Sequence, residues 1–485
     1  MNPDKSGTEE QDGAEAPVNF QYGDILELDV DRAAFEGRAV GRAHGLVVFV
    51  EGAVPGDRVR ARVFRAKKQF VEARAVEILR PSPERVDPRC THFGVCGGCS
   101  WQHMRYEAQA AWKRTHVADA FERIGGFQNL DVHATLEAED IWYYRNKMEY
   151  SFGEKRWLLA VDREQDTPPE PFAVGLHVPG RYDKILHIDA CHLQSPESNS
   201  ILAATRSHYL AHGIRAFSTE THSGDLRHLV IREAKNTGQR MVFLVTSGAN
   251  EDLAAELARV LAAPEFGVTT FVHGVTNRKS SVAIADREHV YFGDGRITER
   301  LGDCTYFISP SSFFQSNTRQ AERLYACAAD FADLRPEDDV WDLYCGAGTI
   351  SLFIAPRVRS VLGVEMNEAA VRDAIDNAAR NGRQNTRFVA ADLRAFIQDT
   401  GREAAPDVVI LDPPRSGLHP DVAAALARLD TKRLVYVSCN PATAARDCAV
   451  LAAGGYVVEA IAPVDMFPHT YHIECVIRLR KKPGA

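Results

Sequence analysis

A glycine loop, followed one strand later by an acidic residue, is the first part of the sequence that could do chemistry. Gly346 and Gly348 follow the apolar stretch 339–344, and Glu365 ends the next such stretch, 19 residues after Gly346. Glycines at such a turn let the backbone approach a ligand closely, and an acid at that place can accept both hydroxyls of a ribose. The loop lacks the full G-x-G-x-x-G pattern that holds a pyrophosphate. The pattern therefore favours the adenosine of S-adenosylmethionine over a dinucleotide, with Asp392 after the third strand as a further contact; purely structural turns are the alternative.

Two loops farther along could bring a substrate and a nucleophile to one place. The sequence Asp-Pro-Pro-Arg-Ser-Gly begins at Asp412, after the fourth expected strand, and Cys439 stands in Ser-Cys-Asn-Pro at the end of the fifth. In a parallel sheet both loops lie at the same edge. Asp412 could orient a bound group, and a cysteine thiolate is a strong nucleophile near neutral pH. The alternatives are a rigid turn at Asp412 and an inert internal thiol at Cys439.

A segment before the last expected strand could supply a general base. It runs Asp-Met-Phe-Pro-His-Thr-Tyr-His-Ile-Glu over residues 465–474. Because it adjoins the fifth strand, we expect His469, His472 and Glu474 to lie near Cys439. A carboxylate in a partly dry pocket can act as a general base. The alternative is an ordinary hairpin edge with solvated side chains.

Four cysteines form a second pattern with metal-binding chemistry. Cys90, Cys96 and Cys99 lie within ten residues, and Cys191 follows about 90 residues later. Four thiolates can hold an iron–sulfur cluster or a structural zinc ion. The Gly-Gly pair between Cys96 and Cys99 leaves backbone amides free to approach cluster sulfides, which favours a [4Fe–4S] cluster.

The elements that must position these groups divide the chain into four parts. Residues 1–17 are polar and acidic and predict a disordered tail. Short alternating strands within 18–82 predict a small β-barrel, before prolines that mark a linker. Residues 83–310 mix strands and helices, which predicts an α+β central domain with a helix near 101–125. Strand–helix alternation in 311–485 predicts an α/β domain with a doubly wound, mainly parallel sheet, which binds ligands at the carboxyl ends of its strands.

The composition is that of a globular chain, with an uneven charge distribution. The 485 residues suit about three domains, and they carry 45% apolar side chains and a net charge of −9. Residues 56–80 nevertheless hold eight basic against three acidic side chains, which suits contact with nucleic-acid phosphates; a solvated strand face is the alternative. The sequence shows neither a membrane-length apolar run nor a secretory signal. We therefore expect a cytoplasmic protein with reduced cysteines and no membrane contact.

Three C-terminal motifs together resemble those of the RNA uridine-5 methyltransferase family. They are Asp412-Pro-Pro-Arg-Ser-Gly, Ser-Cys439-Asn-Pro and Phe467-Pro-His-Thr-Tyr-His-Ile-Glu. The four cysteines look like the ligands of the family's iron–sulfur branch, and the N-terminal strands look like a TRAM domain, a small OB-like barrel that binds RNA. The resemblance is strongest to the bacterial enzymes that act on 23S ribosomal RNA. It implies a Rossmann-like class I methyltransferase domain, S-adenosylmethionine and a [4Fe–4S] cluster as cofactors, and a monomer that acts on RNA.

The same resemblance assigns roles to single residues. Cys439 is the expected nucleophile, which adds to C6 of uracil so that C5 can accept a methyl group, and Glu474 is the expected base that removes the C5 proton. The target uridine must be flipped out of its loop to react. The expected cofactor contacts are Gln315, Tyr344, Gly346, Gly348, Glu365, Asp392 and Asp412. The expected metal ligands are Cys90, Cys96, Cys99 and Cys191. The family's plan also places the helix near 101–125 against the catalytic domain.

Three other interpretations stay open at this point. Transfer RNA is the rival substrate for the same chemistry. A methyltransferase for exocyclic amines also uses an Asp/Asn-Pro-Pro loop, but it needs an aromatic residue where this chain has Arg415, and it leaves Cys439 without a role. A non-catalytic iron–sulfur RNA-binding protein would have no need of an intact cofactor loop, yet Gly346 and Gly348 are both present.

Overall fold

The described part of the chain forms two compact units. This is a computed structural model that places residues 20–159, 162, 167, 169–248, 250–280, 282–400 and 405–482. The tail expected at residues 1–17 lies outside these ranges. The first unit ends at Val86, and the second runs from Asp87 onward. No helix of the described residues is long and apolar enough to span a bilayer. The domain boundaries expected after residues 82 and 310 stay predictions.

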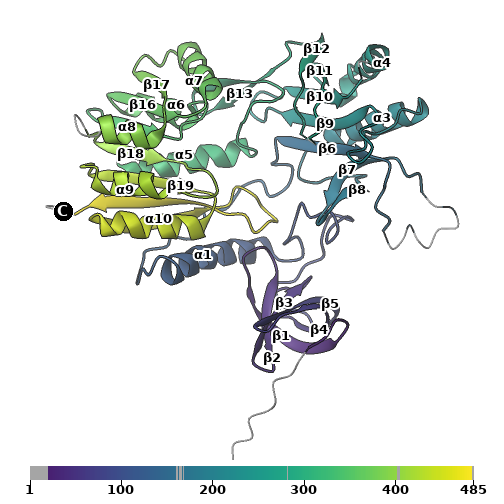
Figure 1. The fold of residues 1–485 in the computed structure, drawn as a ribbon, viewed down its shortest axis with the longest axis horizontal. Coiled ribbons are helices and arrows are strands. Elements are labelled where there is room, and N and C mark those ends of the chain that lie inside the picture. The colour runs from purple at the N-terminus through teal and green to yellow at the C-terminus, as the bar shows by residue number, and fades with distance from the viewer. Residues whose placement is uncertain are drawn as a thin grey trace, which may run out of the picture. The chain divides into compact units, whose positions relative to one another are not determined.

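The first unit is a closed five-stranded barrel (Figure 1). Its strands are β1 (Ile25–Ala33), β2 (Ala39–Ala43), β3 (Leu46–Glu51), β4 (Arg58–Ala66) and β5 (Phe70–Arg80). They pair in the order β1-β2-β3-β5-β4, and β4 closes the barrel on β1. In β1, buried Leu26, Leu28 and Val30 alternate with exposed residues, as one face of the strand points into the core. The predicted OB-like barrel is confirmed.

Acidic side chains of neighbouring strands neutralise most of the basic stretch at residues 56–80. Arg60 pairs with Glu27 on β1 at 2.7 Å, and Arg74 pairs with Glu51 on β3 at 2.8 Å. Arg58, Arg65 and Arg80 are likewise paired, with Asp29 or Glu72. Within the described barrel, Arg62, Lys67 and Lys68 of this stretch show no ion pair. The positive surface is therefore smaller than the sequence predicts, because a count along the chain omits the acids that the neighbouring strands supply.

A seven-stranded sheet forms the central part of the second unit. Its order is β12-β11-β10-β9-β6-β7-β8, and all of its pairs are antiparallel except β10 with β11. The strands are β6 (Lys147–Gly153), β7 (Ala173–Val178), β8 (Arg181–His187), β9 (Leu226–Glu233), β10 (Arg240–Thr246), β11 (Thr270–Val275) and β12 (Arg287–Phe292). Helices α3 (Pro196–Ala211) and α4 (Glu251–Leu261) share an apolar core with this sheet, and η1 (Pro264–Phe266) follows α4. The hairpin of β13 (Ile297–Leu301) and β14 (Cys304–Ile308) then leads to the catalytic part.

A second seven-stranded sheet carries the catalytic motifs, with helices on both faces (Figure 1). Its strands are β15 (Asp339–Leu343), β16 (Ser360–Glu365), β17 (Thr386–Ala390), β18 (Val408–Leu411), β19 (Arg433–Ser438), β20 (Tyr456–Val464) and β21 (Glu474–Lys481). The helices are α5 (Thr318–Ala332), α6 (Thr349–Ile354), η2 (Ala355–Arg357), α7 (Glu368–Arg380), α8 (Leu393–Thr400), α9 (Pro420–Arg428) and α10 (Pro441–Ala453). The order β17-β16-β15-β18-β19-β21-β20 is parallel up to β19, and β21 and β20 are antiparallel additions. The predicted doubly wound α/β domain is confirmed.

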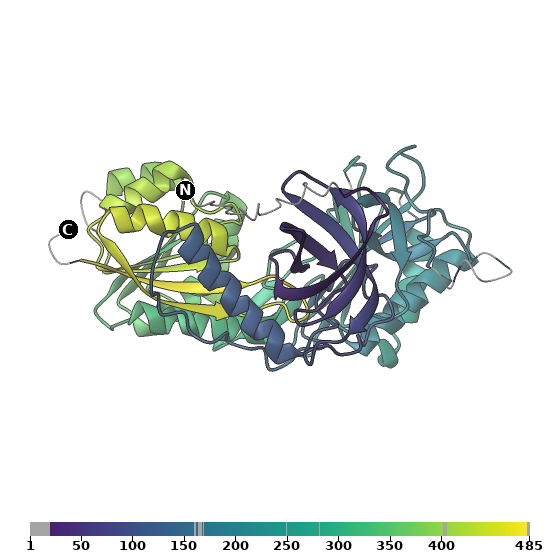
Figure 2. The ribbon, with the colours of Figure 1, turned by 90° about the horizontal axis from the view of Figure 1, so that it is seen from below.

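Helix α1 (Tyr106–Arg123) precedes the central sheet in sequence but packs on the catalytic sheet. It contacts α10 and β20, and both ribbon views show it running along this side (Figures 1 and 2). Val117 and Phe121 share an apolar core with residues of β15 and β19. Lys113 donates to the carboxylate of Asp465 at 2.5 Å, and both side chains are fully buried. The helix is thus part of the catalytic core.

Candidate active site and four-cysteine site

The candidate active site lies at the edge where the parallel strands of the catalytic sheet end. β21 runs antiparallel to β19, with Ser438 opposite Cys475, so β21 begins where β19 ends. This reversal places Glu474, the first residue of β21, beside Cys439, the first residue after β19. Asn440 then caps α10, since its side chain accepts the N–H of Ala442 at 3.1 Å. Cys439 therefore stands at a short, well-braced turn between a strand and a helix.

A hollow of about 670 Å³ opens at this edge. Six of the residues singled out from the sequence line it, namely Gln315, Tyr344, Gly346, Asp412, Cys439 and Glu474. A volume of this size is typical of a pocket for a small ligand or cofactor. The hollow thus brings the expected nucleophile and the expected base together with the glycine loop.

Three expected cofactor residues do not line this hollow. Glu365 lies directly behind the glycine loop, where it accepts the N–H of Gly346 at 3.3 Å. Gly348 begins α6 with φ 80°, and a Cβ there would lie 3.0 Å from a phenylalanine ring. Asp392 accepts the N–H of Arg394 at 3.0 Å at the start of α8 and also pairs with the guanidinium of Arg394. Cofactor contact by these three residues stays a prediction.

Poorly solvated carboxylates lie at and near the hollow: Asp412 and Glu474 line it, and Asp342 lies close to Asp412. Asp342 is 1% exposed, and its Oδ2 accepts the hydroxyl of Ser351 at 2.5 Å. Burial raises the pKa of Asp342 to about 7, and Glu365 adds to the shift. Burial, with Asp342 nearby, likewise raises the pKa of Asp412 to about 7. Burial and Asp412 hold the pKa of Glu474 well above its usual range.

These acids fit a cationic cofactor that carries an adenosine. Crowded, poorly solvated carboxylates are stabilised in their charged form by a nearby cation, which the sulfonium of S-adenosylmethionine would supply. Gly346 has φ 53°, and a Cβ at this position would meet no atom within 4 Å, so the backbone is open to a ligand. The chemistry of the site and the space in it therefore agree with the cofactor expected from the sequence.

The thiol of Cys439 shares this acidic environment. It is half-buried, and burial together with Glu474 and Asp412 raises its pKa to about 11, while Arg415 opposes the shift. The thiol is therefore protonated at neutral pH as long as no cation lies beside the carboxylates. A neighbouring positive charge would favour the reactive thiolate.

The loop from Asp465 to His472 has two faces. Phe467, Thr470 and His472 line the hollow. His469, which we expected near Cys439, turns away instead and stacks on Trp142 with 3.9 Å between the ring centroids. Its backbone has φ 65°, a left-handed conformation that local periodicity does not reveal. Burial lowers the pKa of His469 to about 4, so its ring is neutral at pH 7.

Tyr325 and Arg145 are among the residues of the hollow that sequence reasoning did not single out. Tyr325 is a buried residue of α5, and its hydroxyl lies 3.1 Å from that of Thr349. Its place on the helix that follows the Gln315 segment is the one signal that could have identified it. Arg145 belongs to the central part of the chain, and no local pattern connects it to this site.

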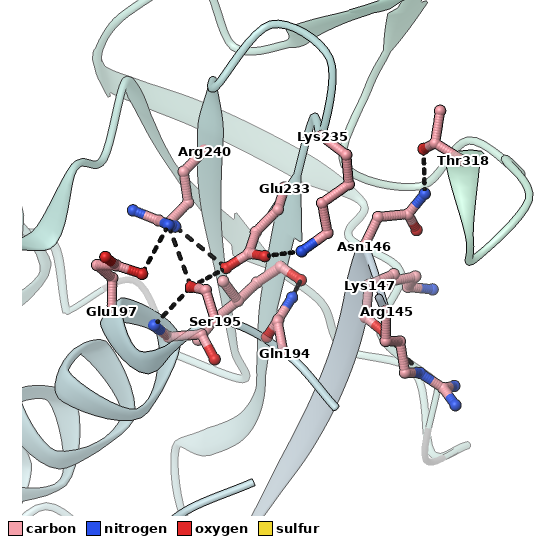
Figure 3. A network of polar contacts seen from close by, with 12 residues as sticks. Arg145, Asn146, Lys147, Gln194, Ser195, Glu197, Glu233, Lys235, Arg240 and Thr318 are labelled. Atoms are coloured by element: carbon pink, nitrogen blue, oxygen red, sulfur yellow. Dashed lines mark hydrogen bonds and ion pairs between the residues drawn. The ribbon is translucent and has the colours of Figure 1, made fainter. Parts of the chain in front are cut away.

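A polar network fixes the segment that carries Arg145 (Figure 3). The next residue, Asn146, donates to the carbonyl of Gln315 at 2.7 Å and to the hydroxyl of Thr318 at 2.9 Å. The backbone carbonyl of Asn146 accepts the N–H of Glu233 at 2.8 Å. The Glu233 carboxylate in turn accepts hydrogen bonds from Ser195, Lys235 and Arg240. The network ties the start of β6 to the segment before α5.

The four cysteines lie together around a neighbouring hollow of about 310 Å³. Cys90, Cys96, Cys99 and Cys191 all line it. Burial raises the pKa of Cys96 to about 11 and of Cys99 to about 12, and in each case two or more of the other three thiols add to the shift. The sulfurs therefore face one another in one dry site. Gly97, Gly98 and Arg145 line both this hollow and the candidate active site.

The four sulfurs do not stand at the spacing of a preformed zinc site. Zinc bound by four thiolates at about 2.3 Å holds their sulfurs about 3.8 Å apart. Within the described ranges, the only group of three or more ligand atoms all within 4.8 Å of one another is His208, His212 and Glu256. The four cysteines do not form such a group. The N–H of Gly98 lies 3.3 Å from Sγ of Cys96, which it donates to.

Comparison with known proteins gives consistent matches over the chain. Residues 280–482 match the family described as tRNA (Uracil-5-)-methyltransferase, and residues 20–76 match the TRAM domain. A protein of Chlorobaculum tepidum named an uncharacterized RNA methyltransferase is 43% identical over 95% of this chain and 97% of its own length. A protein of the same name from Bacteroides thetaiotaomicron is 40% identical over 92% of this chain and 99% of its own length.

A solved structure shares the fold over nearly the whole chain. It is the tRNA (uracil-54, C5)-methyltransferase of Pyrococcus abyssi in complex with S-adenosyl-L-homocysteine. It is 29% identical, with a TM-score of 0.72, and the match covers 94% of this chain and all of that one. With the relatives, the two matched domains and the geometry of the hollow in agreement, the chain belongs to the RNA uridine-5 methyltransferase family, enzymes that use S-adenosylmethionine to methylate uracil in RNA, and residues 20–76 are its TRAM domain.

Proposed function

We propose that this enzyme methylates C5 of a uridine through a covalent bond between Cys439 and C6 of the base, with Glu474 as the general base. The observation that carries the proposal is the juxtaposition of Cys439 and Glu474 in one hollow beside the glycine loop. A methyltransferase for exocyclic amines has no need of a thiol and a base at these positions. A non-catalytic RNA-binding protein has no need of the open loop at Gly346.

The cofactor is proposed to bind in the part of the hollow lined by Gln315, Tyr344 and Gly346, with its cationic end toward Asp412. Bound S-adenosylmethionine supplies an electrophilic methyl group there. Tyr344 has φ 62° and follows β15 directly, which turns its side chain toward the hollow. A cation bound beside Asp412, which lines the hollow, would favour the ionisation of this carboxyl group and of the neighbouring Asp342.

The chain's own groups then carry the remaining steps. Cys439 loses its proton and its sulfur adds to C6 of uracil, which leaves C5 electron-rich enough to take the methyl group. Glu474 removes the C5 proton, and the electron pair of that C–H bond re-forms the C5–C6 double bond as the sulfur leaves C6. The thiolate of Cys439 is regenerated, and Glu474 returns to its starting state when it passes the C5 proton to solvent.

The electrostatics favour this order of events. Cys439 and the carboxylates have a positive neighbour before methyl transfer, which lowers the pKa of the thiol when it must ionise. Once the methyl group has left, that positive charge is gone. Glu474 then becomes more basic at the stage at which it must accept a proton, because burial and Asp412 again dominate its pKa.

The two catalytic residues should give opposite results in an adduct assay. Cys439→Ala should abolish methyl transfer and any covalent RNA complex. Glu474→Gln should still transfer the methyl group but release product at least about 10²-fold more slowly, because the C5 proton has no base. The methylated RNA should then remain attached to Cys439 as a denaturation-resistant, slowly migrating band on a gel.

The control is wild-type enzyme on RNA with 5-fluorouridine at the target, which should be trapped in the same way because fluorine does not leave as a proton. Full turnover by Cys439→Ala would rule out the covalent mechanism.

The pKa of the Cys439 thiol should depend on the charge of the bound cofactor. Its alkylation in the free enzyme should rise with a pKa of about 11. An analogue with an amine in place of the sulfonium should lower this pKa by about one unit or more, because a cation favours the thiolate. S-adenosylhomocysteine is the matched neutral ligand and should have a smaller effect. Mass spectrometry of the Cys439 peptide gives the profiles, and identical profiles with both ligands would contradict the electrostatic argument.

We also propose that Cys90, Cys96, Cys99 and Cys191 ligate a [4Fe–4S] cluster. Four cysteines that line one hollow, with the N–H of Gly98 donating to Sγ of Cys96, support this proposal. Protein purified without oxygen should be brown and contain about four irons per chain, and Cys96→Ala should lose the iron. Cys448→Ala, which changes a cysteine elsewhere in the core, is the control and should keep it. Colourless protein with one zinc would contradict the proposal.

For the target we propose a uridine of 23S ribosomal RNA, with a transfer RNA uridine as the second candidate. The resemblance of the four-cysteine pattern to the ribosomal branch supports the first, and the similarity to the tRNA (uracil-54, C5)-methyltransferase of Pyrococcus abyssi favours the second. The test is mass spectrometry of 5-methyluridine in separated RNA fractions from a deletion strain and its complemented parent. Loss from the large-subunit RNA is the expected result, and loss confined to transfer RNA would establish the second candidate.

A further inference from the structure

The loop that leads to Glu474 is held from its outer side by residues that precede the methyltransferase match. His469 lies at the centre of this contact. Its carbonyl accepts the N–H groups of Ser100 and Trp101 at 2.9 and 3.0 Å. Its own N–H donates to Oε1 of Gln109 at 2.9 Å. Both backbone polar groups of this one residue are thus fixed by a distant part of the chain.

Gln109 connects the parts of this contact. The side chain is fully buried in α1, and its Nε2 donates to the carbonyls of Trp101 and Met104 at 3.0 and 2.8 Å. One amide group therefore fixes the Ser100–Trp101 turn and the His469 backbone at the same time. Leaving such buried donors and acceptors unpaired costs more than exposing them to water would, so the arrangement is rigid.

Further contacts brace the same face of the loop. Lys113 donates to the carbonyl of Phe467 at 3.1 Å, and the hydroxyl of Tyr144 donates to the carbonyl of Pro468 at 3.1 Å. On the inner side, the Thr470 hydroxyl donates to the Phe467 carbonyl at 2.8 Å and accepts the N–H of His472 at 3.2 Å. The chain from His469 to the base is therefore a short, internally bonded turn with little freedom.

The segment that holds His469 comes directly after a predicted cluster ligand. Cys99 is followed by Ser100 and Trp101, and Gly97 and Gly98 before it line both hollows. Gly97 has φ 71°, and a Cβ there would lie 2.3 Å from Pro179, so this stretch is tightly packed. A ligand that fixes the position of Cys99 would therefore also fix the N–H groups of Ser100 and Trp101, which donate to the carbonyl of His469.

We propose that Gln109 and the Ser100–Trp101 backbone are positioning elements for Glu474, and that the filled four-cysteine site anchors them. The inference rests on the proposed function, since it assigns Glu474 the removal of the C5 proton. The inference predicts that disturbing these positioning elements affects one step of the reaction, the removal of the C5 proton. Cofactor contacts at Gly346 and Gln315 lie elsewhere in the hollow, so loosening the His469 loop slows proton removal and leaves cofactor binding unchanged.

The first arm of the test uses Gln109→Ala in the full-length, iron-loaded enzyme. Misplacing a catalytic group by about 1 Å costs about 10²-fold in rate. Turnover should fall by this order, the methylated RNA–protein adduct should accumulate as with Glu474→Gln, and the cofactor Kd and iron content should not change. Gln109→Glu keeps the acceptor for His469 and should recover part of the activity. Thr115→Ala, whose hydroxyl bonds within α1 to the carbonyl of Ala111, is the matched control.

The second arm tests the anchor with Cys99→Ser. This variant should lose its iron and show the same adduct accumulation with an unchanged cofactor Kd. If it does not fold, the Gln109→Ala arm still decides the positioning role, because that variant keeps the four cysteines.

The outcomes separate this inference from the proposed function. If Glu474→Gln traps no adduct, the proposed base is wrong and the inference fails with it. Suppose instead that Glu474→Gln traps the adduct, but Gln109→Ala turns over slowly without accumulating an adduct or binds the cofactor more weakly. The proposed function then stands, and the positioning role of Gln109 is wrong. An iron-free Cys99→Ser variant with wild-type turnover would remove the anchoring role of the four-cysteine site.

Discussion

Burying carboxylates next to one another is the constraint on which the rest of this site depends. Asp342 and Glu474 are buried and Asp412 is half-buried, so water solvates their charges poorly, and a neighbouring carboxylate raises the pKa of each of them. Such a group is costly to ionise until a cation arrives. A ligand that carries a positive charge is therefore bound with its charge where the chemistry needs it. The thiol of Cys439 shares this field, so the same charge that delivers a methyl group also prepares the nucleophile.

The catalytic sheet does not complete its own active site. Arg145 reaches the hollow from the start of β6, and α1 holds the outer side of the loop before Glu474. The family match that contains Cys439 and Glu474 covers residues 280–482, so these supports lie outside it. Helix α1 packs on the sheet through Val117 and Phe121. Its Lys113 also forms a fully buried ion pair with Asp465, which follows β20. Removing either partner of such a pair is more damaging than the pair's net contribution suggests, because it leaves one charge buried alone.

Local patterns predicted the strand–helix alternation and the parallel sheet of the catalytic domain, and they failed where distant segments meet. Apolar runs and strand–helix alternation are local signals, and the parallel-sheet rule alone brings Asp412 and Cys439 to one edge. The neutralised barrel charges were not predictable in this way, since Glu27 and Glu51 pair with arginines of other strands. The orientation of His469 depends on a left-handed backbone and on Trp142, more than three hundred residues away in sequence. Neither of these contacts leaves a local trace in the sequence.

The position of β21 has a consequence for how the protein is made. This strand is the last in sequence, yet it lies between β19 and β20 rather than at an edge. All residues of β19 are buried in the finished fold. During synthesis, one edge of β19 therefore has no partner strand until β21 has been made. Chains that stop early would expose this apolar edge to other chains. The catalytic domain can thus fold fully only after translation has passed Lys481, so enzyme activity requires that β21 has been made.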